Sequence, residues 1–189
     1  MRLRSVTVVL ALAALASQAR AEIVGQPIKR AADEAEIKAS LSRIELVDES
    51  GAPFDLRALL ASGKPALVTL WAHWCANCKA EMAGFKKIAA ACPEASNIVF
   101  VSARAGDYAK DLAKFETYDL PWKLYRVTPD VATDLAKAKT ARAFYGATAD
   151  GGVVTPLHYF VSRRGEVELI VNARMDFENP RRLAAFCAG

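Results

Sequence analysis

The sequence predicts one α/β domain of three layers, with helices on both faces of a mixed β-sheet. Two observations support this. Short apolar stretches alternate with stretches of helical periodicity through residues 66–145. Two further strand-like stretches, residues 157–162 and 166–173, then follow each other across an Arg-Arg-Gly turn and predict an antiparallel hairpin.

Residues 1–21 have the features of a cleaved secretory signal. A basic start precedes an apolar run of about eleven residues, and a small-x-small triplet ends at Ala21. The apolar run is shorter than the roughly 20 residues that span a bilayer, although an uncleaved anchor is the alternative. Removing the signal leaves 22 basic and 21 acidic residues. This balance gives no indication of nucleic-acid binding, and we expect an exported, periplasmic protein.

The remaining chain, about 168 residues, suits a single domain. We expect a lead-in at residues 22–42 and the domain proper at residues 43–189. In chain order we predict a helix at 33–41, a strand, turn, strand and short helix within 43–65, and a strand at 65–71 that is buried on both faces.

The second half of the chain continues this alternation. The residues at 78, 82, 85, 89 and 92 recur at helical spacing, and Pro93 ends that helix. Further elements are a strand at 97–103, a helix at 107–118, a strand at 123–127, a helix at 129–145, the closing hairpin, and a last helix that starts at Asn179-Pro180.

The pair Cys75-Ala76-Asn77-Cys78 has three interpretations. A zinc site needs four ligands, but the chain has two histidines and its other two cysteines lie singly. A purely structural disulfide would close a very small loop and stabilise little. A redox pair fits best, because a cysteine where a strand meets a helix N-terminus is favoured as the thiolate. Cys75 is then the exposed nucleophile and Cys78 the buried resolving thiol.

The stretch "VTLWAHWCANC" resembles the thioredoxin active site. The longer stretch "IELVDESGAPFDLRALLASGKPALVTLWAHWCANCKAEM" resembles the exported TlpA and ResA group of thioredoxin-like proteins. The resemblance covers residues 43–186 and is weakest at 107–145. It implies a thioredoxin-like α/β/α fold with an N-terminal β-hairpin extension, and a protein-disulfide oxidoreductase that needs neither metal nor cofactor.

The resemblance also implies partners. These are client proteins with disulfides, of the cytochrome c or copper-centre assembly type, and a membrane thiol-disulfide electron donor. It favours a reducing role, although the sequence itself leaves the direction of electron flow open.

Several site residues follow from the resemblance. The family's cis-proline loop corresponds to Thr155-Pro156 rather than to Thr128-Pro129, and Thr155 would offer its backbone to the substrate. Trp74 is expected to be a partly exposed wall beside Cys75 that helps to dock partners.

This sequence also departs from thioredoxin near the motif. Thr69 stands where thioredoxin has a buried aspartate, and Ala83 stands where the family has a helix-kinking proline, so we expect a straighter helix. Glu81, which is characteristic of the TlpA and ResA group, would accept the proton of Cys78 if it is partly buried. A surface glutamate is the alternative. We expect His73 and His158 to be surface residues.

Four cysteines allow three complete pairings. In thioredoxin folds the motif helix and the last helix cover one face of the sheet, so the resemblance makes a Cys92–Cys187 disulfide plausible. Its loop of about 95 residues corresponds to on the order of 4 kcal/mol in the chain-entropy model. Two buried free thiols are the alternative.

Other functions stay open. One is a thiol oxidant or isomerase of the same fold. Another is a copper-binding or chaperone module that uses Cys75, Cys78 and a histidine as Cu(I) ligands. A peroxidase is less favoured, because the sequence lacks a single cysteine in a threonine- and proline-rich setting.

Overall fold

The computed structural model describes residues 32–92, 97–148 and 150–177. The predicted signal at 1–21, the last helix from Asn179 and the cysteine at 187 lie outside the described residues.

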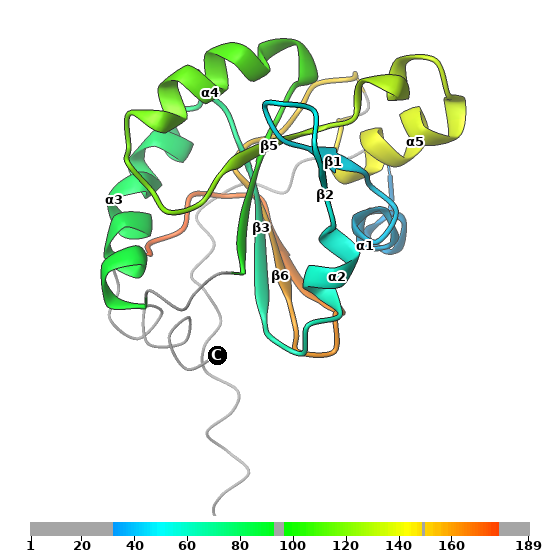
Figure 1. The fold of residues 1–189 in the computed structure, drawn as a ribbon. Helices are drawn as coiled ribbons and strands as arrows, with labels where there is room; N and C mark the ends of the chain where they lie inside the picture. Colours follow the sequence, from blue (N-terminus) through cyan, green and yellow to red (C-terminus); the bar gives the residue numbers. More distant parts are fainter. Residues whose placement is uncertain (1–31, 93–96, 149, 178–189) are drawn as a thin grey trace, which may run out of the picture.

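A seven-stranded mixed sheet forms the centre of the molecule (Figure 1). Its strand order is β2-β1-β5-β4-β3-β6-β7. β3, β4 and β5 are parallel, and every other neighbouring pair is antiparallel. The predicted mixed sheet, closing hairpin and N-terminal hairpin are therefore confirmed. The strands are β1 (Leu46–Val47), β2 (Pro53–Phe54), β3 (Ala66–Trp71), β4 (Ile98–Ser102), β5 (Leu124–Val127), β6 (Leu157–Val161) and β7 (Val167–Val171).

Helices cover both faces of this sheet, which confirms the three predicted layers (Figure 1). In the sheet, β4 lies beside β3 and β5 lies beside β4, so both parallel connections move across the sheet in the same direction. Right-handed crossovers therefore place α3 and α4 on the same face. α1 and α5 contact each other on the opposite face. The helices are α1 (Glu34–Leu41), α2 (Leu56–Leu60), α3 (Ala76–Ala91), α4 (Tyr108–Glu116) and α5 (Leu135–Phe144), with 3₁₀ turns η1 (Ala105–Asp107) and η2 (Pro129–Ala132).

The central strand β3 is buried along its whole length, as its unbroken apolar run predicted. Trp71, at its end, is fully buried and packs edge-on against Phe115 of α4, with ring centroids 5.4 Å apart. The end of the strand that leads to the cysteine pair is thus packed against α4.

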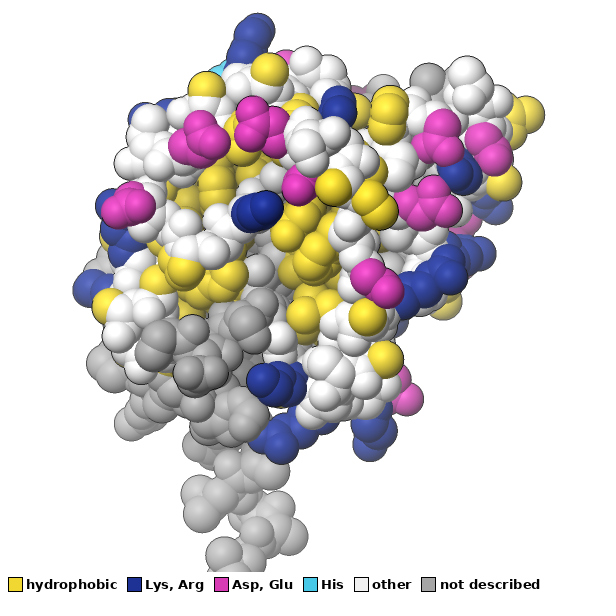
Figure 2. Space-filling view, in the orientation of Figure 1, with side chains coloured by type: hydrophobic (Ala, Val, Ile, Leu, Met, Phe, Trp, Pro, Cys, Tyr) yellow, Lys and Arg dark blue, Asp and Glu magenta, His cyan; other side chains and the backbone are white. Residues whose placement is uncertain are grey.

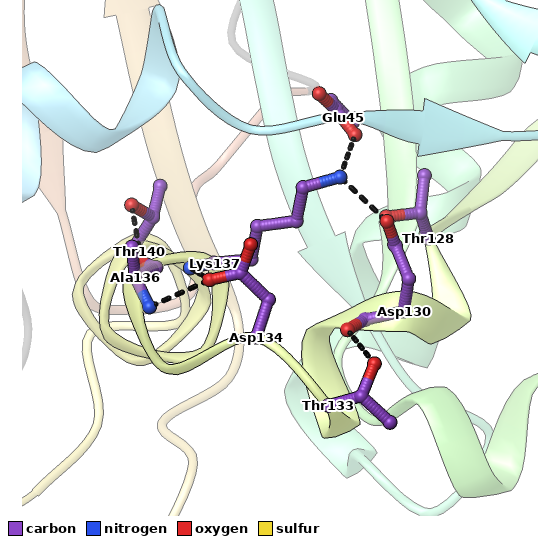
Figure 3. A network of polar contacts seen from close by, with 8 residues as sticks. All are labelled: Glu45, Thr128, Asp130, Thr133, Asp134, Ala136, Lys137 and Thr140. Atoms are coloured by element: carbon purple, nitrogen blue, oxygen red, sulfur yellow. Dashed lines mark hydrogen bonds and ion pairs between the residues drawn. The ribbon is translucent and has the colours of Figure 1, made fainter.

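The prediction of one helix over residues 129–145 is wrong, because two separate elements, η2 and α5, form there. η2 ends before Asp134, whose side chain accepts hydrogen bonds from the backbone N–H groups of Ala136 and Lys137 at 2.8 and 3.1 Å. An aspartate that caps a helix in this way starts a new helix. Lys137 then bonds Asp130 at 2.5 Å and Glu45 at 2.8 Å, which ties α5 to η2 and to the start of β1 (Figure 3).

The helix of the lead-in is part of the core. Asp33 caps α1 by accepting from the N–H of Glu36 at 2.7 Å, which confirms the predicted helix. Ile37 and Leu41 are buried in the same cluster as the sheet residues. On the face drawn in Figure 2, basic and acidic side chains are interspersed with apolar ones.

Candidate active site

Cys75 lies where β3 passes into α3. A turn after Trp71 is closed by a hydrogen bond from the N–H of Cys75 to the carbonyl oxygen of Ala72, at 3.1 Å. Cys75 is the N-cap of α3, and its Sγ accepts the N–H of Cys78 at 3.0 Å. The predicted position at a helix N-terminus is therefore confirmed, and the sulfur accepts one of the N–H groups that lack a partner within the helix.

Cys75 and Cys78 form a disulfide, with their Cα atoms 5.3 Å apart. Cys78 is fully buried, as predicted, but Cys75 is only 5% exposed. The expectation of an exposed nucleophile is thus wrong for the oxidised pair, since the Cys75 sulfur turns back onto the first turn of α3.

Trp74 directly precedes Cys75 and is 40% exposed, which agrees with the predicted partial exposure. Its indole N–H donates to Asp107 Oδ2 at 3.3 Å. The guanidinium of Arg104 lies 5.0 Å from its ring centroid. The segment after β4 therefore holds the indole from two sides, while its role in substrate contact stays a prediction.

A buried aspartate anchors the turn before Cys75. Asp111 of α4 is fully buried and accepts the backbone N–H of His73 at 2.8 Å. It also bonds His73 Nδ1 at 2.6 Å and the hydroxyl of Ser102 at 2.6 Å. Sequence reasoning missed Asp111. The available signal was its position three residues after Tyr108 and four before Phe115, which are both buried.

Glu81 lies inside the protein, three residues after Cys78 on the buried face of α3. It is 2% exposed, and its Oε1 accepts the N–H of Met175 at 2.5 Å. The surface alternative for Glu81 is therefore wrong. Its catalytic role stays a prediction.

His158 of β6 is fully buried, so the expectation of a surface residue is wrong for this histidine. It pairs with Thr69 across the register of β6 and β3. Its Nδ1 lies 3.1 Å from Thr69 Oγ1 and its Nε2 lies 3.2 Å from Glu81 Oε1. His73, in contrast, keeps 29% of its side chain exposed.

The Thr155–Pro156 peptide bond is cis, as the resemblance implied. The next residue, Leu157, pairs with Leu70 of β3. Thr155 and Pro156 therefore lie at the end of the paired strands β3 and β6 where the turn to Cys75 begins. Contact of Thr155 with a substrate stays a prediction.

α3 runs as one α-helix through Ala83 and ends at Ala91, close to the predicted stop. Cys92 is its C-cap, is 6% exposed and is not a free thiol. Because Cys187 lies outside the described residues, the Cys92–Cys187 disulfide stays a prediction.

In the part of the chain that the structure describes, no three His, Cys, Asp or Glu side chains are grouped as a metal site. Within those same residues, no helix combines the length and apolar character needed to cross a membrane.

Solved structures share this fold. A thioredoxin-family thiol:disulfide interchange protein from Chlorobium tepidum aligns with a TM-score of 0.54 and 19% identity over 77% of this chain and 92% of its own. A putative protein disulfide isomerase from Bacteroides thetaiotaomicron aligns with a TM-score of 0.53 and 17% identity, over 87% of this chain and 90% of its own. A secreted disulfide oxidoreductase from Mycobacterium tuberculosis aligns at 0.50 and 24% identity, over 81% and 99%.

Curated relatives match over shorter lengths. The thiol:disulfide interchange protein DsbE of Yersinia pestis is 42% identical over 48 residues, a quarter of each chain. The soluble secreted antigen MPT53 of Mycobacterium tuberculosis is 45% identical over 56 residues, 30% of this chain and 31% of its own. The match thus spans less than a third of either relative. The profile of the AhpC/TSA family, however, matches residues 37–170, most of the described domain, and the chain belongs to that family.

Proposed function

We propose that the protein is a protein-disulfide oxidoreductase that works outside the cytoplasm through Cys75 and Cys78. The observation that carries this is the disulfide at the N-terminus of α3, with Cys78 fully buried and a buried carboxylate three residues further on. The names of the relatives, a thiol:disulfide interchange protein and a secreted antigen, support both the activity and the location.

The reduced pair would act in two steps. The Cys75 thiolate attacks a client disulfide and forms a mixed disulfide, and the first client sulfur leaves and takes a proton. Cys78 then passes its proton to Glu81 and attacks the Cys75 sulfur. The second client thiol is released, two electrons have passed to the client, and the Cys75–Cys78 disulfide is restored.

We further propose that the protein works as a reductase, re-reduced by a membrane thiol-disulfide donor, and that its clients belong to cytochrome c or copper-centre assembly. This part rests on the resemblance of the motif region to exported thioredoxin-like proteins. Trp74 and the Thr155-Pro156 segment would dock the client, since Trp74 directly precedes Cys75 and Thr155-Pro156 lies at the end of the paired strands β3 and β6 where the turn to Cys75 begins.

Trapping a mixed disulfide tests the activity. A Cys78→Ser variant should accumulate a covalent complex with a disulfide-bearing protein, because the resolving thiol is missing. A matched Cys75→Ser variant should accumulate none. Equal trapping by both variants, or by neither, would contradict the assigned roles.

The reduction potential of the pair, measured against glutathione or dithiothreitol, tests the direction. A value near thioredoxin's, about −270 mV, agrees with a reductase. A value near that of a strong oxidant, about −120 mV, would make the protein a disulfide donor instead.

A further inference from the structure

Three polar side chains from three different elements form a buried chain that ends at Glu81, three residues after Cys78 on α3. They are Thr69 of β3, His158 of β6 and Glu81 of α3, and their exposed fractions are 0%, 0% and 2%. The imidazole connects the other two, with contacts of 3.1 Å to the hydroxyl and 3.2 Å to the carboxylate. Thiol-disulfide exchange itself uses only a proton acceptor near Cys78, so the histidine and the threonine need their own explanation.

The hydrogen bonds fix where protons can reside. Glu81 Oε1 already accepts the N–H of Met175, and an ionised carboxylate can only accept, so His158 Nε2 is the donor to it. Nδ1 then accepts the hydroxyl proton of Thr69 when the imidazole is neutral. When the imidazole is charged, Nδ1–H donates to the same oxygen, because a hydroxyl both donates and accepts. His158 thus stays hydrogen-bonded in either protonation state.

Among the described residues, His158 has one charged partner, Glu81. Glu81 faces it from α3, Thr69 from β3, and the Phe177 ring from the segment after β7, with ring centroids 5.6 Å apart. On its own strand the neighbouring ring is Phe160. A lone ionised carboxylate buried this deeply is strongly unfavourable. Glu81 and His158 together can hold one proton as a pair without net charge.

Cys78 lies within reach of this pair. It is fully buried and precedes Glu81 by three residues on the same face of α3, a spacing at which side chains are neighbours. Among the described residues, the second carboxylate oxygen of Glu81 has no assigned hydrogen-bond partner. That oxygen is available for the proton of Cys78.

We propose that His158, held by Thr69, is a positioning residue that keeps Glu81 ready to accept the proton of Cys78 in the resolving step. This inference rests on the proposed function. As Cys78 attacks the Cys75 sulfur, its proton moves to Glu81, and His158 and Thr69 keep the charge of the pair hydrogen-bonded. When the disulfide is reduced again, the pair returns the proton to the leaving Cys78 sulfur.

A two-phase thiol reaction tests this without any client protein. Reduced protein is mixed with dithiobis-nitrobenzoate, an aromatic disulfide. Attack by Cys75 releases one coloured thionitrobenzoate, and attack by Cys78 on the mixed disulfide releases the second. A Cys78→Ser variant lacks the second release and so identifies it.

The variants are His158→Gln, which keeps a donor but does not titrate, and Thr69→Val, which removes the hydroxyl at similar volume. In the wild type the second phase should slow less than tenfold between about pH 8 and pH 6, because a base takes the proton. In His158→Gln it should slow about tenfold per pH unit, as expected for an unassisted thiol. In Thr69→Val the pH dependence of the second phase should lie between those of the wild type and His158→Gln. The first phase should be unchanged in both variants.

The matched control is Tyr159→Phe. This change removes a different buried hydrogen bond, from the adjacent residue of β6 to the Phe144 carbonyl oxygen, and should leave both phases unchanged. A second phase with the same pH profile in His158→Gln as in the wild type would overturn the role of His158 while the proposed function stands. No release by wild-type Cys75 would overturn both.

Discussion

Replacing Gly84 by alanine tests how tightly the segment after β7 is packed on the motif helix. A Cβ atom at position 84 would lie 2.6 Å from the Cβ of Phe177, and 3.1 and 3.2 Å from its backbone C and Cα atoms. Unstrained carbon contacts lie at about 3.5–4.0 Å, so this segment must shift by roughly 1 Å. Rotating the Phe177 ring does not relieve the contact, because the crowded atoms are Cβ and backbone.

The free energy of unfolding should fall as a result. Overpacking costs about 1–3 kcal/mol, and a backbone neighbour places the cost toward the upper end of that range. Alanine regains about 1 kcal/mol of helix propensity, which leaves a net loss of about 1–2 kcal/mol. The shift also moves Met175, two residues before Phe177, away from the Glu81 carboxylate that accepts its N–H.

Urea unfolding of the wild type, Gly84→Ala and Ala83→Gly measures this. Ala83 is exposed on the same helix, so its change to glycine measures only the effect of helix propensity. We expect it to lower the free energy of unfolding by about 1 kcal/mol. If Gly84→Ala were as stable as the wild type or more so, the close packing of Phe177 on α3 would be refuted.

Three further changes have expected outcomes. Trp74→Ala should raise KM for a protein client and leave the rate with dithiobis-nitrobenzoate unchanged, because the exposed indole contacts only large partners; equal effects on both substrates would contradict this. Asp111→Asn should lower the free energy of unfolding by about 1–3 kcal/mol in urea titrations, because one of the two buried oxygens that accept hydrogen bonds becomes an NH2 group that cannot accept. Lys137→Met should lower Tm at neutral pH. The Lys137 hydrogen bond is the main cause that holds the pKa of Asp130 below its ordinary 3.8, so this stabilisation exists above that pH and is lost as pH falls through the lowered pKa. The Tm difference between variant and wild type should therefore shrink as the pH is lowered below 3.8, and a constant difference would contradict the assignment.

The local parts of the site could be predicted from the sequence because they lie close together in the chain. An apolar run, a turn and a helical pattern meet at Cys75, so its place at the start of α3 follows from neighbouring residues. The succession of strands and helices along the chain followed from the same alternation. The break between η2 and α5 was missed, since a capping aspartate inside a helical pattern has the same spacing as an ordinary helical residue.

The sequence by itself thus determined the α/β order, the cysteine pair and the helix end that presents it. Only the tertiary structure decided what surrounds the pair. His158 and Thr69 are 89 residues apart, and Asp111 and His73 are 38 apart. Whether His158 faces Glu81 depends on strand alternation and on the register of β6 against β3, where a shift by one residue would turn its side chain to the other face. Register and helix packing arise from contacts distant in the chain, and so no local pattern records them.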